Sequence, residues 1–264
     1  LKEPKKDSRP EGGLHIRMPD PPLVQEQRLE AKVDAAVAYA KANGIDKFIT
    51  NPKKATLGII TSGKSYKDVM QSLDDLGLTV KDAEKLGIRI YKVGLVWPLE
   101  NKGVLEFAKG LKEILVVEEK REMIEHQLKT LLYGQKDQPR LVGKHDDKGE
   151  VLLPFAGGHT PALVALAMAK RIAATCGKNA TTKAVAERAK YIQALQDQAE
   201  KFADTVTRLP YYCAGCPHNT STKVPEGSRA VAGIGCHYMV QWMNRSSNII
   251  THMGGEGVNW VGHA

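Results

Sequence analysis

The stretch Ala55-Thr56-Leu57-Gly58-Ile59-Ile60-Thr61 is followed directly by Ser62-Gly63-Lys64-Ser65, and these two runs predict how the chain folds. The first run is apolar and β-branched through its middle, which is typical of a buried strand. Ser62-Gly63 would form a short turn, and a helix would begin near Lys64. A strand joined to a helix by a short turn is the repeating unit of α/β proteins.

Residues 58–65 also match the spelling G-x-x-x-x-G-K-S of a nucleotide-binding P-loop, so a P-loop NTPase is an alternative interpretation. A P-loop needs a strand that ends before its first glycine and a loop whose N–H groups wrap the phosphates. Here Gly58 lies inside the strand-like run, and Ile59 and Ile60 occupy loop positions with residues typical of strands. We therefore predict a buried strand through Gly58, a helix start at Lys64 and no phosphate beside it.

Strand and helix patterns continue to alternate after this unit. The alternation predicts an α/β fold with a doubly wound parallel sheet and helices on its faces. We expect these elements to form one domain over residues 51–135, preceded by an N-terminal arm and helix over residues 1–50. The predicted strands are 55–61, 88–93 and 113–118, and the predicted helices are 23–43, 64–76, 101–110 and 120–132.

Residues 136–205 are expected to be an interdomain linker and helices. The linker is rich in Gly, Pro and Asp, and its segments 140–143 and 151–153 are expected to pair as a small hairpin. Helices should follow at about 160–175 and 180–204, the first with Thr160 as cap and proline at its first position.

Residues 206–264 differ in composition from everything before them, because they are rich in Cys, Gly, Asn and aromatic residues. Short strands are expected at 229–234 and 247–252. Since the chain lacks an initial methionine and stops directly after a glycine-rich segment, we expect a fragment of a longer chain whose last domain is truncated.

Composition excludes several classes of protein. The 264 residues are 42% hydrophobic, which suits a globular protein, and the net charge of +8 comes from scattered lysines rather than a basic stripe. We therefore expect no nucleic acid as a partner. No run approaches the ~18 apolar residues of a membrane span, and no signal peptide is visible, so we expect a cytoplasmic protein with no membrane partner.

Three of the four cysteines fall within a short stretch. Cys213 and Cys216 form a C-x-x-C, and Cys236 follows beside His237. Thiolates at this spacing can hold zinc, with His218 or His237 as a fourth ligand, or an iron–sulfur cluster, which would need a further cysteine. They can also simply pack. Cys176 stands apart and is expected to pack.

Two glycine-rich turns follow the expected strands of this last region. They are Gly233-Ile234-Gly235-Cys236 and Gly254-Gly255-Glu256-Gly257. Glycines at strand ends let the backbone approach a diphosphate, and a carboxylate among them can hold the Mg²⁺ that bridges its oxygens. Taken singly, either turn can equally be an ordinary tight turn.

Taken together, these motifs resemble a known family. The order C-x-G-C, G-I-G-C and G-[D/E]-G resembles the thiamine-diphosphate domain of the 2-oxoacid:ferredoxin oxidoreductases. YYCAGCPHNTST (211–222), GIGCHYM (233–239) and MGGEGVNW (253–260) are most similar to the indolepyruvate ferredoxin oxidoreductases. The segments 58–69, 87–100 and 113–129 are similar to the transketolase-C-terminal-like domain that precedes the thiamine-diphosphate domain in this family.

The resemblance implies a set of site residues but no catalytic residue. Cys213, Cys216 and Cys236 would be three ligands of a [4Fe–4S] cluster whose fourth ligand lies beyond Ala264. Glu256 would hold Mg²⁺, although it stands where the family's usual motif has aspartate. The residues implied to bind thiamine diphosphate are Gly233, Gly235, Cys236, His237, Gly255, Glu256 and Gly257.

The resemblance also implies a function. The parent enzyme would oxidatively decarboxylate indolepyruvate or a related aryl 2-oxoacid to an acyl-CoA, with coenzyme A as co-substrate and ferredoxin as electron acceptor. The remaining domains of the parent chain and a second copy in a homo-oligomer would be partners, and this fragment alone would be inactive. A zinc-binding interaction module remains the alternative that explains the cysteines without a cofactor.

Overall fold

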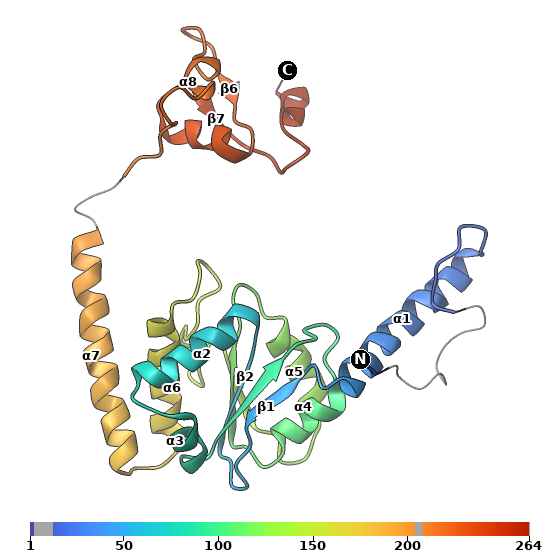
Figure 1. The fold of residues 1–264 in the computed structure, drawn as a ribbon, viewed down its shortest axis with the longest axis vertical. Helices are drawn as coiled ribbons and strands as arrows, with labels where there is room; N and C mark the ends of the chain where they lie inside the picture. Colours follow the sequence, from blue (N-terminus) through green and yellow to red (C-terminus); the bar gives the residue numbers. More distant parts are fainter. Residues whose placement is uncertain (3–12, 204–207, 264) are drawn as a thin grey trace. The chain divides into compact units, whose positions relative to one another are not determined.

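A computed structural model describes residues 1–2, 13–203 and 208–263 of the chain (Figure 1). The chain divides into two compact units, residues 1–197 and residues 198–264. In the first unit the helices are α1 (Pro22–Ala42), α2 (Gly63–Asp75), α3 (Val80–Lys85), α4 (Asn101–Ala108), α5 (Ile124–Leu132), α6 (Pro161–Thr175) and α7 (Ala180–Ala203), which runs on into the second unit. Its strands are β1 (Lys47–Thr50), β2 (Leu57–Ser62), β3 (Ile88–Val93), β4 (Glu113–Val117) and β5 (Arg140–Val142).

The five strands of the first unit form one sheet in the order β1-β3-β2-β4-β5. Strands β3, β2, β4 and β5 are parallel, and β1 pairs antiparallel with β3 at the edge. The predicted α/β class and parallel sheet are therefore confirmed. β1 and α3 were not predicted, although Thr79 and Asp82 form a capping box that marks the start of α3.

Both faces of the sheet are covered by helices (Figure 1). Leu57 and Ile59 of β2 point to the face that packs against α2, α3 and α6, where Met168 of α6 is fully buried. Ile60 points to the opposite face, against α4 and α5. The strands are therefore apolar on both sides, as expected for a parallel sheet between helical layers.

Gly58 decides between the strand and the P-loop. It lies inside β2, paired with Arg89 of β3 and Ile114 of β4. A Cβ added at Gly58 would lie only 2.8 Å from the ring of Phe107, so the glycine permits close packing of α4 on the sheet. Residues 57–62 thus form a strand rather than an open loop. The P-loop NTPase interpretation is wrong, because the backbone that would have to wrap the phosphates is paired with β3 and β4 in the sheet.

The segment expected to be a linker contributes to the first unit instead. Residues 140–142 do not form a hairpin strand but pair in parallel with β4, because Val142 is apolar and fully buried there. In place of the expected hairpin, the described residues of this segment form a single antiparallel bridge between His145 and Val151. α6 packs directly on the sheet, and Thr160 caps it as predicted, accepting a hydrogen bond from the Leu163 N–H.

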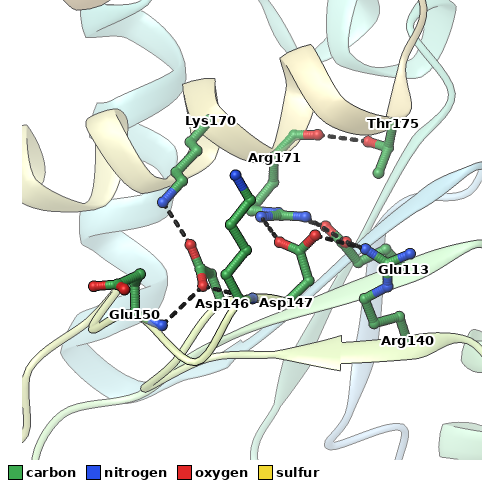
Figure 2. A network of polar contacts seen from close by, with 9 residues as sticks. Glu113, Arg140, Asp146, Asp147, Glu150, Lys170, Arg171 and Thr175 are labelled. Carbon is green, nitrogen blue, oxygen red and sulfur yellow. Dashed lines mark hydrogen bonds and ion pairs between the residues drawn. The ribbon is translucent and has the colours of Figure 1, made fainter.

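A polar network joins α6 to the amino end of β4 (Figure 2). Arg171 is 2% exposed, and its Nε and Nη2 each lie 2.6 Å from an oxygen of the buried Glu113 carboxylate. Its Nη1 donates to Asp147 at 2.7 Å, and Arg140 of β5 reaches Asp147 from the other side at 2.9 Å. Next to it, Lys170 pairs with Asp146 at 2.6 Å.

The second unit is smaller and has little regular structure. It contains α8 (His218–Ser221), β6 (Ala230–Val231), β7 (Ser247–Asn248) and the 3₁₀ helices η2 (Gly235–Trp242) and η3 (Val258–Gly262). β6 and β7 form a parallel pair, at the positions where two longer strands were expected. Among the described residues of both units, no helix is long and apolar enough to cross a membrane.

Candidate functional site

The cysteine-rich residues of the second unit surround its small core. Tyr212, Ala232 and Val240 are buried together, and Cys216 packs against them. Tyr212 comes from the C-x-x-C segment, Ala232 follows β6, and Val240 lies on η2. This core therefore brings the C-x-x-C segment and the G-I-G-C turn into contact.

The C-x-x-C segment is a tight turn that ends in α8. The Cys216 N–H donates to the Cys213 carbonyl at 3.1 Å, and the Asn219 side chain donates to the same carbonyl at 3.0 Å. Cys213 and Cys236 are exposed, Cys216 is half-buried, and none of them forms a disulfide. The thiols are thus chemically free, and two of them are accessible to solvent.

Two imidazoles join the two cysteine-bearing segments. The Nδ1 of His218 lies 3.3 Å from the Cys216 Sγ, and its ring stacks on Tyr212 at 5.2 Å. The same ring meets that of His237 edge-on at 5.7 Å. His237 is next to Cys236 in sequence, so this contact holds the G-I-G-C turn against the C-x-x-C turn.

His237 is itself fixed by the glycine turn. Its Nδ1 accepts a hydrogen bond from the Gly233 N–H at 2.7 Å, and the Tyr212 hydroxyl donates to its carbonyl at 3.3 Å. Because Nδ1 is an acceptor, the neutral ring carries its proton on Nε2, which leaves that atom a hydrogen-bond donor. Gly235 adopts a φ of +67°, a conformation that glycine adopts without strain, and leads into η2.

The thiols are of the right chemistry for a cluster or a zinc ion, but they are not assembled into a metal site. Within the described parts of the chain, no group of three or more His, Cys, Asp or Glu side chains is placed to hold a metal. The Cys216 Sγ and the His218 Nδ1, which lie 3.3 Å apart, are two possible ligand atoms side by side. The side chains are therefore of the type that binds a cluster or a zinc ion, and they lie on segments that contact each other. They are not arranged around a common metal position.

The second glycine turn has local contacts. Gly254 and Gly257 have φ values of +86° and +83°, and a Cβ on Gly255 would lie 2.8 Å from the His252 ring, so the turn depends on its glycines. The exposed Glu256 carboxylate accepts the Gly254 N–H at 2.8 Å through Oε2. One oxygen of this carboxylate is thus held by the backbone of its own turn. Because the side chain is exposed, its other oxygen is able to bind Mg²⁺.

Two further residues, to which motif reasoning gave no role, lie beside these turns. Arg245 Nη1 donates to the Asn219 carbonyl at 3.1 Å and to Thr222 Oγ1 at 2.8 Å, and its guanidinium lies 5.8 Å from the Tyr212 ring centre. Arg245 thereby ties α8 to the segment before β7. Asn259 lies just beyond the G-E-G turn, and among the described residues its shielded side-chain oxygen and nitrogen have no hydrogen-bond partner. No local pattern marks Arg245, because it acts through tertiary contacts. Asn259 lies within the quoted segment MGGEGVNW (253–260), but that motif gave its side chain no role.

Comparison with known families identifies the first unit. Residues 47–199 match the family described as "Indolepyruvate oxidoreductase domain". The chain belongs to the indolepyruvate oxidoreductase family. The match begins at β1 and extends into α7, so the family's domain runs across the boundary expected at residue 135 and includes β5 and α6.

Curated relatives agree with this assignment. The chain is 26% identical over 196 residues to indolepyruvate oxidoreductase subunit IorA of Pyrococcus horikoshii, covering 72% of this chain and 26% of that protein. The corresponding subunit of Thermococcus kodakarensis is 28% identical over 196 residues, with the same coverage. That of Methanothermobacter marburgensis is 27% identical over 113 residues, covering 43% of this chain and 17% of that protein. The chain thus spans about a quarter of the length of the Pyrococcus horikoshii and Thermococcus kodakarensis proteins.

Two solved structures are weakly similar. One is 2-oxoglutarate:ferredoxin oxidoreductase from Magnetococcus marinus, with a TM-score of 0.36 and 16% identity over 62% of this chain and 26% of that chain. The other is a split gene transketolase, with a TM-score of 0.32 and 16% identity over 56% of this chain and 43% of that chain.

Proposed function

We propose that this chain is part of a ferredoxin-dependent enzyme that oxidatively decarboxylates indolepyruvate or a related aryl 2-oxoacid to an acyl-CoA. Membership of the indolepyruvate oxidoreductase family supports the enzyme class. Coenzyme A is the proposed acyl acceptor, ferredoxin the proposed electron acceptor, and the cytoplasm the proposed location. The rest of a longer chain, present as a homo-oligomer, would complete the active site.

The observation that carries this proposal is the contact between the C-x-x-C turn and the G-I-G-C turn. His218 and His237 hold the two segments together, and Cys213, Cys216 and Cys236 are free thiols on them. These three residues would supply ligands to a [4Fe–4S] cluster, which accepts and passes on single electrons. Because Cys236 follows Gly235 directly, the turn that approaches a diphosphate would also carry a cluster ligand.

The glycine turns and Glu256 are proposed to hold thiamine diphosphate and its Mg²⁺. The cofactor supplies the electron sink that lets carbon dioxide leave the 2-oxoacid. The residues of this chain would bind and orient it. Glu256 would place a charged oxygen on the metal, and the glycines of both turns would let backbone N–H groups approach the diphosphate. The unpartnered Asn259 side chain, just after the second turn, supports a polar occupant there.

Replacing Glu256 by glutamine tests this proposal in the full-length enzyme. The substitution keeps size and hydrogen bonding but removes the charge, so the affinity for thiamine diphosphate should fall and depend more steeply on added Mg²⁺. Isothermal titration at several Mg²⁺ concentrations measures both effects. Glu226→Gln is the matched control, because Glu226 is an exposed acidic residue of the same unit outside the turn. If both variants bind thiamine diphosphate with the same affinity, the Gly-Glu-Gly segment is an ordinary turn with no role in binding the cofactor.

The contact between Cys216 and His218 favours one alternative, a zinc-binding interaction module. Zinc would hold the same cysteines without any cofactor, and it gives no visible absorption. Metal analysis of anaerobically purified protein separates the two proposals. Iron with sulfide supports the oxidoreductase, whereas stoichiometric zinc supports the interaction module.

A further inference from the structure

The first unit has an open pocket at the carboxyl ends of its central strands. From β2 the chain crosses over to β3 on one side, whereas from β4 it continues to β5 on the other. The crevice between β2 and β4 is therefore the point where the strand order reverses, which is where open α/β sheets bind ligands. A pocket of about 620 Å³ lies there. It is lined by Ser62 at the end of β2, residues 63–65 at the start of α2, residues 118–121 after β4, and Val96, Met123 and Ile124.

The two acidic residues of this pocket are already satisfied by donors. Glu118 accepts the N–H groups of Met123, Ile124 and Glu125 at 3.1, 2.8 and 3.0 Å, so it caps α5. Glu119 accepts hydrogen bonds from Lys64 Nζ and from the His159 N–H, both at 3.0 Å. Both carboxylates therefore already have donors from this chain, and Lys64 pairs with the charge of Glu119.

The Lys64 side chain is likewise already paired with groups of this chain. Its ammonium group lies 2.9 Å from Asp68 and 3.0 Å from Glu119, and the His159 carbonyl accepts a further hydrogen bond from it. The hydrogen bond to Asp68, followed by that to Glu119, raises the pKa of Lys64, while Lys64 lowers the pKa of Glu119. Both groups are therefore charged near neutral pH, and the carboxylates of Asp68 and Glu119 offset the charge of Lys64, which explains why a phosphate is not expected at this lysine.

Donors remain free in the pocket beside this pair. Ser65 is only 4% exposed and lines the pocket, and in the described residues its hydroxyl has no hydrogen-bond partner. Ser65 lies in the first turn of α2, and in this part of the structure no side chain caps that helix start. Arg121 is exposed, with its guanidinium 5.9 Å from the Phe155 ring centre. A buried hydroxyl, an uncapped helix start and a guanidinium all favour an anion.

The charges around the pocket indicate how much negative charge a bound anion can have. The lining contains the cations Lys64, Lys120 and Arg121 and the carboxylates of Glu118 and Glu119, and Asp68, which pairs with Lys64, adds a third carboxylate, so the charges balance. A site without excess positive charge matches a monoanion better than a phosphate dianion or a nucleotide. Val96 and Met123 are partly exposed apolar side chains in the same lining, and they suit an apolar ligand body.

We infer that this crevice binds a small organic monocarboxylate. Its carboxylate would lie at the start of α2, accepting hydrogen bonds from Ser65 and Arg121, and its apolar part would rest on Val96 and Met123. The site belongs to the first unit and uses none of the cysteines or glycine turns of the second. It is thus a ligand site separate from the chemistry proposed above.

Titration of the ¹⁵N-labelled 264-residue chain with phenylacetate, followed by ¹H–¹⁵N spectra, tests the inference. We expect saturable shifts of the amide signals of residues 63–65 and 118–123, and no such shifts with 2-phenylethanol, which lacks the charge. Arg121→Gln should weaken binding about tenfold, as expected for loss of one charge-assisted hydrogen bond. Ser65→Ala should also weaken it. Lys67→Gln is the matched control, because Lys67 is exposed on the same helix and lies outside the lining.

Several results would overturn the inference. Saturable shifts with inorganic phosphate at lower concentrations than with phenylacetate would make it a phosphate site. Equal shifts with 2-phenylethanol would make it an apolar groove without anion recognition, and the absence of saturable shifts would remove the site. Equal weakening by Arg121→Gln and Lys67→Gln would leave only a general charge effect. Because the titration needs no metal or cofactor, its failure would leave the proposed oxidoreductase function standing.

Discussion

The two units are held together in different ways. The first buries apolar residues on both faces of a five-stranded sheet and pairs its buried Arg171 with Glu113. The second has a small core of Tyr212, Ala232 and Val240, and imidazole, guanidinium and backbone contacts join the segments that carry its cysteines. The first unit is therefore stabilised mainly by burial of apolar residues, whereas the metal group proposed above would add to the few contacts that stabilise the second unit.

The largest effect on the first unit is expected from Arg171→Met. The substitution would leave the Glu113 carboxylate buried without its bidentate partner, so the free energy of unfolding should fall by about 3–5 kcal/mol. Urea unfolding followed by circular dichroism measures the loss, because most of the helices lie in the first unit. The double variant Glu113→Leu/Arg171→Met removes both charges and should recover most of that stability. If the double variant is as unstable as the single one, lost packing rather than an unpaired charge is responsible.

A smaller loss is expected from Gly58→Ala. The new methyl group would lie 2.4 Å from the Leu111 side chain and 2.8 Å from Phe107, so the free energy of unfolding should fall by about 1–3 kcal/mol through overpacking. Gly158→Ala is the control, since its Cβ would meet its nearest neighbour at an ordinary 3.7 Å. Equal stability of the two variants in urea would mean that Gly58 is not enclosed between α4 and the sheet.

The smallest stability effect is expected from Asp146→Asn, and it should depend on pH. The hydrogen bond from Lys170, together with the backbone N–H groups of Lys148 and Glu150, lowers the pKa of Asp146 to about 2. Because the folded pKa lies below the unfolded value of about 3.9, the charged carboxylate contributes stability above about pH 4. That contribution is lost as the pH falls through the folded pKa.

Melting temperatures of wild type and Asp146→Asn should therefore differ at pH 6 and converge as the pH falls from 4 towards 2. Asp137→Asn, which alters an exposed aspartate of the same region, should show no comparable convergence. A gap between wild type and Asp146→Asn that stays constant down to pH 2 would show that the Lys170–Asp146 pair has no electrostatic role.

The contrast between the units also explains how far the sequence could be interpreted. Apolar, β-branched runs predicted β2, β3 and β4 within about two residues at each end, because fully buried parallel strands have a strong local signal. β5 was missed as a sheet strand, since Arg140-Leu141-Val142 is too short to have a period of its own. α5 begins at Ile124 rather than near residue 120 because Glu118 caps it, which is a tertiary contact.

For the candidate site, spacing alone made Cys213, Cys216 and Cys236 candidates, because C-x-x-C is a local motif and a third cysteine follows it closely. The arrangement around them could not be predicted. The ring contact of His218 with His237 and the position of Arg245 beside Tyr212 arise only when the two segments fold together. The role of the three cysteines as cluster ligands stays a prediction.

Anaerobic iron–sulfide reconstitution of the full-length protein tests the central claim most directly. Wild type should develop a broad visible absorption that bleaches on reduction, and Cys213→Ala and Cys236→Ala should each abolish it. Cys176→Ala is the matched control: this thiol lies in the first unit, where burial raises its pKa, and its loss should leave the absorption unchanged. An absorption band that survives both Cys213→Ala and Cys236→Ala would contradict the assignment of the second unit as the carrier of the redox centre.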